Sequence, residues 1–247
     1  ANSVTLGVIS DWAVNKGRVR KSFSAFSVSL QTLIDANYFD VALGADDTVF
    51  YWRAFFARSG DFDGIPYYIP YSADAVEGKN FIDSHKSLYK QLLRWGWGAV
   101  DFPLSVKNFL KKGDIQLSKK VSWFTRHIKE RVILTNIVFL ITFGFAIVTM
   151  VNPYVKQSNF AYSLPKIMSL VLTLTMAFMV PGVYFRRKFS PPFPKNWGWF
   201  RRSLTFFETP LITINLLTYS FLPTLHAQTM LIFGKRFKDL YHTQKVR

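Results

Sequence analysis

Three side chains of one short segment, YKQLLRWGW, have types and spacing that could do chemistry on a polar ligand. Gln91, Arg94 and Trp95 stand at positions i, i+3 and i+4, so they share one face of a helix. That face offers an amide, a permanent cation and a flat indole, which suit a sugar held against an aromatic plane with a diphosphate nearby. The alternative is a helix on a bilayer surface, with Trp95 and Trp97 as anchors and Arg94 snorkelling.

Two adjacent carboxylates form a second candidate site. Asp46 and Asp47 directly precede a predicted helix over 48–58. A carboxylate can act as a general base and take a proton from an attacking hydroxyl group. Acidic residues at this position also serve as ordinary helix N-caps, so the pair by itself leaves both roles open.

The elements that would position these residues alternate between helix-like and strand-like patterns. Within residues 1–103, apolar spacing predicts helices over 23–36, 48–58 and 84–100, and a short β-rich run over 65–71. Such alternation is typical of an α/β or α+β layer, and we expect that architecture for the N-terminal part.

Composition limits the classes of protein that this chain could be. Of its 247 residues, 49% are hydrophobic and 17% aromatic, too many for a disordered or collagen-like chain, and the absence of cysteine excludes disulfides and cysteine nucleophiles. The formal charge of +16 is uneven: residues 1–103 have 10 Lys and Arg against 11 Asp and Glu, whereas residues 104–247 have 21 against 4. The basic residues collect beside uncharged runs, which favours a membrane partner over nucleic acid.

Uncharged runs in the second part have the length of membrane spans. Residues 132–151 and 167–185 each approach the roughly 30 Å that a helix needs to cross a hydrocarbon core. The stretch 203–233 predicts either one tilted helix or a hairpin. Basic residues are dense before the first span and in the loop 186–202 but sparse in the loop 152–166, so the positive-inside rule places the latter outside the cell.

The chain therefore divides into three predicted parts. Residues 1–103 form a cytosolic domain, 104–131 form interfacial amphipathic helices, and 132–247 form a transmembrane region with a cytosolic basic loop and tail.

Three blocks of the sequence resemble one enzyme family. Q-x-x-R-W is the signature of membrane-embedded family-2 glycosyltransferases, the group of cellulose, chitin and hyaluronan synthases, and Tyr89 to Pro103 is similar to the version in bacterial relatives. The segment Asn37 to Phe56 resembles the family's Glu-Asp segment, and Leu222 to Phe237 resembles relatives with a shared Ala-Gln-Thr. The three blocks stand in the family's order.

The resemblance implies a fold, a reaction and roles for residues. It implies the C-terminal part of a GT-A-like α/β domain followed by an α-helical transmembrane region, located in a bacterial inner membrane with the catalytic part cytosolic. Asp47 matches the general base, and Asp46 stands where the family usually has Glu. Gln91, Arg94 and Trp95 match the substrate-binding signature. The implied reaction is inverting transfer from a nucleotide-sugar donor to a growing glycan or lipid-linked acceptor.

The resemblance also implies a divalent metal, Mg²⁺ or Mn²⁺, whose ligands are not in this chain. Asp61 and Asp63 have D-x-D spacing, but they follow the base in a polar turn, whereas the family's motif precedes it, so we interpret them as a loop. The histidines lack metal-ligand spacing. The residues before Asp47 contain neither a Gly-rich phosphate loop nor a D-x-D, and we expect the nucleotide-binding half to be missing from this chain.

The alternative function is that of a non-catalytic membrane transporter or assembly subunit with a small cytosolic domain. A transporter that binds its substrate would carry ionisable groups inside its spans. The two predicted spans over 132–151 and 167–185 have none, which favours the enzyme.

Overall fold

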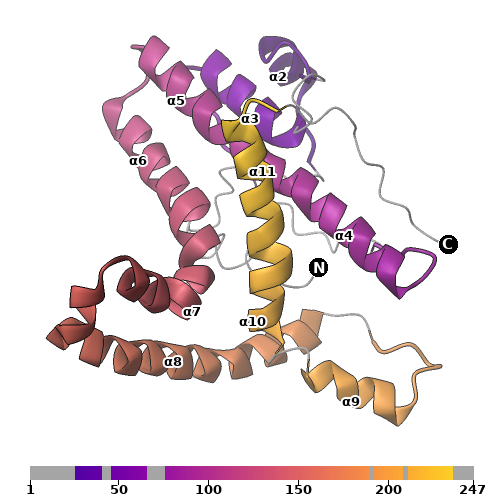
Figure 1. Ribbon diagram of the computed structural model, residues 1–247. Helices are drawn as coiled ribbons and strands as arrows, with labels where there is room; N and C mark the ends of the chain where they lie inside the picture. The colour runs from indigo at the N-terminus through magenta and orange to yellow at the C-terminus, as the bar shows by residue number, and fades with distance from the viewer. Residues whose placement is uncertain (1–25, 41–45, 66–75, 190–191, 208–210, 236–247) are drawn as a thin grey trace. The chain divides into compact units, whose positions relative to one another are not determined.

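The computed structural model describes residues 26–40, 46–65, 76–189, 192–207 and 211–235, and these are mainly helical (Figure 1). Helices account for 76% of the described residues, and these contain no strand or sheet. The α/β architecture expected for the N-terminal part is therefore wrong. The β-rich run over 65–71 lies outside the described residues except for Ile65.

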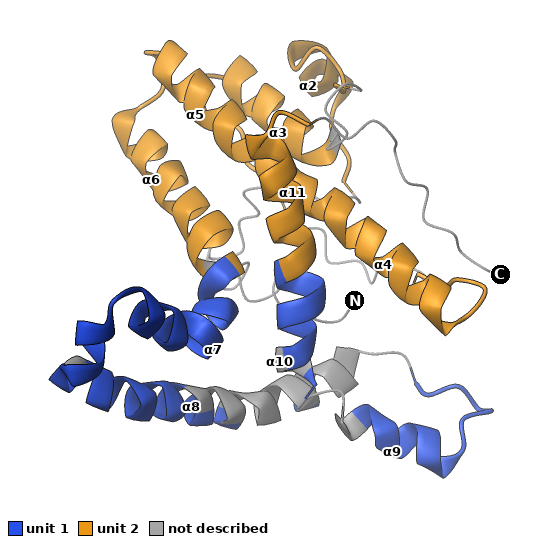
Figure 2. Ribbon diagram, viewed as in Figure 1, with its two compact units in different colours: residues 1–7, 136–221 blue, residues 8–135, 222–247 orange. Residues whose placement is uncertain are grey.

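The helices group into two compact units, shown in different colours in Figure 2. Unit 2 spans residues 8–135 and 222–247, and unit 1 spans 1–7 and 136–221. The described elements of unit 2 are α2 (Leu30–Asp35), α3 (Asp46–Ala57), α4 (Phe81–Gly96), η1 (Trp97–Val100), α5 (Asp101–Lys111), α6 (Leu117–His127), the π-helical η2 (Ile128–Ile133) and α11 (Leu222–Ile232). Those of unit 1 are most of α7 (Leu134–Val151), then η3 (Pro153–Gln157), α8 (Asn159–Phe189), α9 (Trp199–Phe207), α10 (Ile212–Asn215) and the π-helical η4 (Leu216–Phe221).

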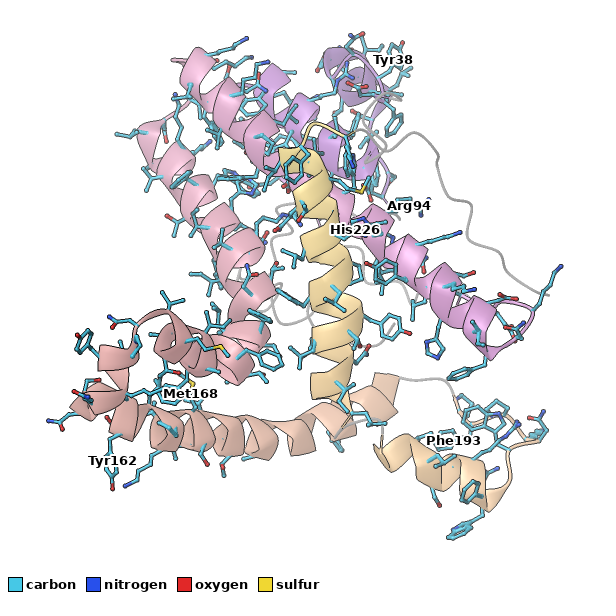
Figure 3. The ribbon with its side chains drawn as sticks, viewed as in Figure 1. Tyr38, Arg94, Tyr162, Met168, Phe193 and His226 are labelled. Atoms are coloured by element: carbon cyan, nitrogen blue, oxygen red, sulfur yellow. The ribbon has the colours of Figure 1, made fainter. Side chains whose placement is uncertain are left out.

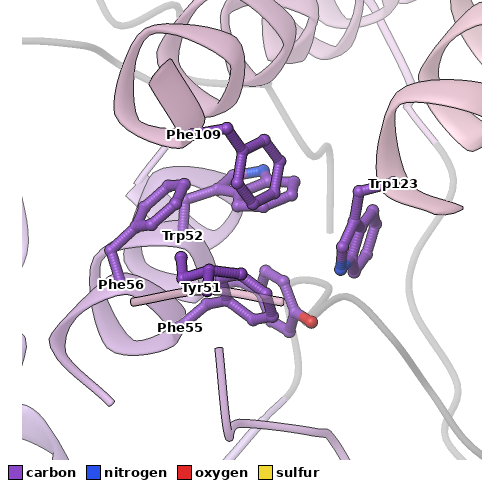
Figure 4. Packing of buried hydrophobic residues seen from close by; sticks show 7 residues of the cluster. Tyr51, Trp52, Phe55, Phe56, Phe109 and Trp123 are labelled. Carbon is purple, nitrogen blue, oxygen red and sulfur yellow. The ribbon is translucent and has the colours of Figure 1, made fainter. Parts of the chain in front are cut away.

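Aromatic side chains from α5 and α6 cover the inner face of α3. Trp52 is fully buried, and its ring lies 4.7 Å from that of Trp123 on α6 and 5.8 Å from that of Phe109 on α5, measured between ring centroids. Figure 4 shows Trp52 among these rings and that of Phe56. Full burial of each large apolar side chain contributes about 1.5–3 kcal/mol. A helix covered in this way needs no sheet to exclude water from its inner face.

The turn between α5 and α6 is fastened to the end of α3. Lys112 Nζ donates to the carbonyl of Phe56 at 2.6 Å, and Lys119 Nζ donates to the carbonyl of Gly60 at 3.1 Å. The Ser59 hydroxyl donates to an Asp114 carboxylate oxygen, and this hydrogen bond holds the pKa of Asp114 below its ordinary value. Lysine ammonium groups at a helix C-terminus satisfy carbonyls that have no partner within the helix.

The chain leaves α3 through two residues in the left-handed backbone region. Ser59 has φ 50° and Gly60 has φ 83°, and the Gly60 amide donates to the carbonyl of Phe55 at 2.8 Å. This is the geometry of a helix C-cap, for which glycine is the favoured residue. The stop that the sequence indicates near Gly60 thus lies where the backbone turns away from the helix.

Helix α4 is amphipathic and is capped at its start. The Asn80 side chain accepts from the amide of Asp83 at 2.8 Å, which satisfies one of the unpaired donors of the first turn. Near its other end α4 packs against α11, which lies across it within unit 2 (Figure 1). The sequence stretch 203–233 is therefore divided, because its last helix belongs to the same unit as α4.

A single glycine allows the close contact between α4 and α11. A Cβ placed on Gly96 would lie 3.0 Å from the Cβ of Ala227 and 3.1 Å from the Cα of Thr224. These distances are shorter than ordinary van der Waals contact, so any side chain at this position would require the α11 backbone to shift by a few tenths of an ångström.

No helix in the described part of the chain is long and apolar enough to cross a membrane by itself. The expected transmembrane region of single spans over 132–151 and 167–185 is corrected accordingly. By length and composition, one bent pair of helices, Leu117–Ile133 with Thr135–Val151, meets the requirement together. The first predicted span, 132–151, differs from the structure because its uncharged run begins inside the π-helical segment η2, whereas the regular helix α7 begins at Leu134.

Gly96→Ala should separate α4 from α11. We expect the free energy of unfolding to fall by about 1–3 kcal/mol, because the added methyl group meets backbone and the helices must move apart. Gly98→Ala is the matched control, since its Cβ would lie 3.9 Å from the nearest atoms and should leave stability unchanged or slightly higher. Denaturant unfolding of the purified variants measures both values, and equal stabilities would contradict the close contact.

Candidate functional site

The three residues of the Q-x-x-R-W segment lie on α4 as the sequence predicts. Gln91 and Arg94 are partly buried, whereas the Trp95 indole is 48% exposed. Leu93, between them in sequence, points into the protein and is buried. One edge of α4 thus presents an amide, a guanidinium and an open aromatic ring to the surroundings (Figure 3 labels Arg94).

Trp97 behaves differently from Trp95 although it is only two residues away. It is 5% exposed and belongs to a small apolar cluster with the buried Val49 at the start of α3. Trp97 is therefore a core residue and not a bilayer anchor. The surface-helix interpretation of this segment loses one of its two tryptophans.

The candidate base stands at the beginning of α3. Helix α3 starts at Asp46, and a carboxylate oxygen of Asp47 accepts from the amide of Thr48 at 2.7 Å. The positive end of the helix dipole favours a negative charge at this place. A carboxylate held by its neighbour's amide in a partly buried position keeps a fixed direction, which both an N-cap and a base require.

All three blocks that carry the family resemblance meet in the cluster around Trp97. Val49 comes from the first block, Trp97 from the second, and Met230 and Leu231 from the third. The other partly buried members are Val100 and Leu104. Segments separated by about 50 and 130 residues thus share one apolar contact, which fixes α3, η1 and α11 relative to each other within unit 2.

The start of α3 also touches the turn that follows α4. A Cβ placed on Gly98 would lie 3.9 Å from the Thr48 hydroxyl oxygen and 3.9 Å from Arg131 Nη2. The structure therefore brings the residue next to Asp47 against the segment that directly follows Trp95. Gln91 is seven residues before Gly98, about 10 Å further along the helix, so it lies furthest from this contact.

A buried polar layer, which sequence reasoning missed, lies between α5 and α6–η2. Asp101, fully buried, accepts from Arg131 Nη2 at 2.8 Å, and the Ser105 hydroxyl bonds to His127 Nε2 at 2.9 Å. Because the Ser105 hydroxyl also donates to the carbonyl of Phe102 at 2.9 Å, His127 Nε2 is best assigned as the donor of their bond. The available signal was the i, i+4 spacing of each pair, Asp101 with Ser105 and His127 with Arg131.

Polar contacts also join α11 to the other helices. The hydroxyl of Tyr89 on α4 lies 3.2 Å from His226 Nδ1, and the Gln228 side chain donates to the backbone carbonyl of Arg131 at 3.3 Å. Figure 3 shows His226 on α11 where this helix crosses α4. The Ala-Gln-Thr of the third block therefore has a structural use, because its alanine faces Gly96 and its glutamine binds η2.

Among the described residues, no three His, Asp or Glu side chains lie close enough together to hold a metal ion. Asp61 and Asp63 are both exposed in the turn after α3, in keeping with their interpretation as a loop.

Comparisons with known proteins add nothing to this geometry: no family model, no curated protein and no solved structure matches the chain.

The contact between the start of α3 and the turn after α4 can be tested by a disulfide. Because the chain has no cysteine, Thr48→Cys combined with Gly98→Cys introduces one unique pair at neighbouring positions, since a Cβ on Gly98 would lie 3.9 Å from the Thr48 hydroxyl oxygen. We expect rapid cross-linking under mild oxidation, detected as a shift in non-reducing electrophoresis. Thr48→Cys with Gly113→Cys is the control and should stay reduced, since nothing lies within 4 Å of a Cβ at Gly113. Equal cross-linking of both pairs would contradict the contact.

Proposed function

We propose that this chain serves an inverting glycosyltransferase that works at a membrane surface. The substrates are a nucleotide-sugar donor and a growing glycan or lipid-linked acceptor. The observation that supports the proposal is that the three family-like blocks meet at Val49, Trp97 and Leu231. The candidate base Asp47 is two residues before Val49, and Trp95 of the candidate sugar-binding face is two residues before Trp97. The three blocks thus lie together in one part of unit 2, as the parts of a single site would.

The proposed chemistry assigns one role to each group. The Asp47 carboxylate takes the proton of the acceptor hydroxyl while that oxygen attacks the anomeric carbon of the donor sugar. The bond between the anomeric carbon and the diphosphate breaks, and the nucleoside diphosphate leaves with the electron pair. Arg94 offsets charge on the diphosphate, Gln91 donates or accepts hydrogen bonds, and the open face of Trp95 supports the acceptor sugar.

This proposal depends on the helical site and not on an α/β layer. The divalent metal that the resemblance implies has no ligand group among the described residues. When bound in such enzymes, a divalent cation neutralises charge on the leaving diphosphate. In this proposal the Arg94 guanidinium supplies positive charge for the same purpose.

The hairpin of α5 and α6 supports the membrane-surface location. Its outer side exposes large apolar side chains, with Leu110 84% and Leu117 74% exposed. The same side carries Phe102, Val106, Val121 and Phe124, and the rings of Phe102 and Phe124 lie 6.1 Å apart. The exposed Lys107 and Lys111 border the apolar residues on α5. An apolar face beside lysines fits the boundary between acyl chains and anionic headgroups.

Asp47→Asn tests the proposal most directly. We expect the rate of sugar transfer to fall about 10²- to 10⁴-fold, because the amide cannot accept the hydroxyl proton. Transfer from radiolabelled nucleotide-sugar into glycan or lipid product, in membranes that contain the protein, measures the rate. Asp61→Asn changes an exposed carboxylate in the nearby turn and should leave it unchanged. Equal rates for the Asp47→Asn variant and the unmodified protein would refute Asp47 as the base, and a larger loss from Asp46→Asn would move the role to that residue.

Trp95→Ala separates sugar binding from anchoring. We expect about a tenfold lower transfer rate, because stacking on the indole is lost, with normal amounts of protein in the membrane. Trp199→Ala is the control, since Trp199 is 80% exposed on α9 of unit 1 and should leave the rate unchanged. A Trp95→Ala protein that fails to accumulate but has normal activity per molecule would instead identify an anchor.

A further inference from the structure

We propose that Arg131 is a positioning residue that sets the geometry of the candidate site from the far side of the turn after α4. The proposal rests on the proposed function for its catalytic consequence, whereas its structural part stands on the contacts of Arg131 alone. Arg131 lies in η2, outside the three blocks that resemble the enzyme family.

One nitrogen of the guanidinium holds two elements together. Arg131 Nη2 donates to an Asp101 carboxylate oxygen at 2.8 Å and to the Gly98 carbonyl at 3.1 Å. Asp101 is the first residue of α5, and Gly98 lies in η1, the turn that joins α4 to α5. The two bonds therefore fix where the chain goes after it leaves the Q-x-x-R-W helix.

The backbone of Arg131 adds a third element. Its carbonyl accepts from the Gln228 side chain at 3.3 Å, so η2 is tied to α11 as well as to η1 and α5. Asp101 and Gln228 both belong to family-like blocks, in the segments GWGAVDFP and HAQT. Residues from two blocks thus bind one arginine.

The buried carboxylate makes this arrangement hard to replace. Asp101 is 0% exposed, and a carboxylate in such a place is stable only with a charged, hydrogen-bonded partner. The planar guanidinium fixes the directions of its donors, whereas the lysine ammonium has three rotatable donors at the end of a shorter side chain. Lysine would keep the ion pair with Asp101 and lose the second bond to Gly98.

The effect reaches the candidate base through Gly98. The site of a Cβ on Gly98 is 3.9 Å from both Arg131 Nη2 and the Thr48 hydroxyl, and Thr48 is the residue after Asp47. A shift of η1 would change the distance between the start of α3 and the end of α4, which carry the proposed base and the proposed sugar platform. Displacements of about 1 Å in such pairs lower rates by about 10²-fold.

The test compares Arg131→Lys with Arg126→Lys in the whole chain. Arg126 is the matched control, because it lies about one turn earlier and forms its ion pair with Glu130, four residues along the chain, at 2.6 Å. Each substitution is combined with Thr48→Cys and Gly98→Cys, and the rate of disulfide formation is measured. Circular dichroism checks that each variant is folded.

We expect Arg131→Lys to slow disulfide formation about tenfold or more and to lower kcat by a similar factor, with KM for the donor unchanged within about twofold. Arg126→Lys should leave both rates unchanged. An unchanged disulfide rate in a folded Arg131→Lys protein would overturn the proposal. If Arg131→Lys does not fold, the neutral pair Asp101→Asn with Arg131→Gln takes its place, and the same two outcomes apply.

The same experiment distinguishes failure of the proposed function from failure of the positioning role of Arg131. If the unmodified protein transfers no sugar but Arg131→Lys still slows the disulfide, Arg131 positions η1 and the assigned reaction is wrong. A lower kcat with an unchanged disulfide rate would contradict the route through Gly98.

Discussion

The close contact of Gly96 with Ala227 is the constraint on which the candidate site depends. Two helices can approach this closely only where one of them has no side chain, so the position of α11 on α4 is determined at one residue. Met230 and Leu231 then reach Val49 and Trp97, and Gln228 reaches η2. This contact acts together with those of Met230, Leu231 and Gln228 to place the last described helix of unit 2 beside α3 and α4.

The aromatic core around Trp52 fixes the position of α3, as the contact between Gly96 and Ala227 helps to fix that of α11. Trp52 packs between α5 and α6, so the middle of α3 is held while its first turn, with Asp47, stays partly open. The polar layer of Asp101, Ser105, His127 and Arg131 lies beside this core, since the His127 ring centroid is 5.4 Å from that of Trp52. Apolar packing supplies most of the stabilisation, and the buried bonds select one alignment of α5 against α6.

Local patterns in the sequence were sufficient for some of these elements and not for others. Helices α3 and α4 lie close to their predicted positions because their apolar residues have helical spacing, and Gln91, Arg94 and Trp95 share α4 for the same reason. The α/β prediction failed because it depended on one short β-rich run, 65–71, whereas the described residues contain helices and no strand. No local sequence pattern indicates that residues 222–232 pack on α4, since the contact joins positions about 130 residues apart. The arginine of η2 was missed because a basic residue before an apolar run is usually read as a membrane flank.

The lysines that fasten the α5–α6 hairpin change the meaning of the chain's large positive charge. Lys112 and Lys119 use their ammonium groups on the backbone carbonyls of Phe56 and Gly60, and Lys120 donates to those of Phe109 and Lys112 at 2.7 and 2.6 Å. These cations keep their charge but are partly buried and bound to backbone carbonyls, so they hold the hairpin together as well as adding to the positive charge of the chain. Acetylation would separate the two kinds of lysine: at Lys107 it would weaken attraction to an acidic surface, whereas at Lys120 it would loosen the hairpin itself.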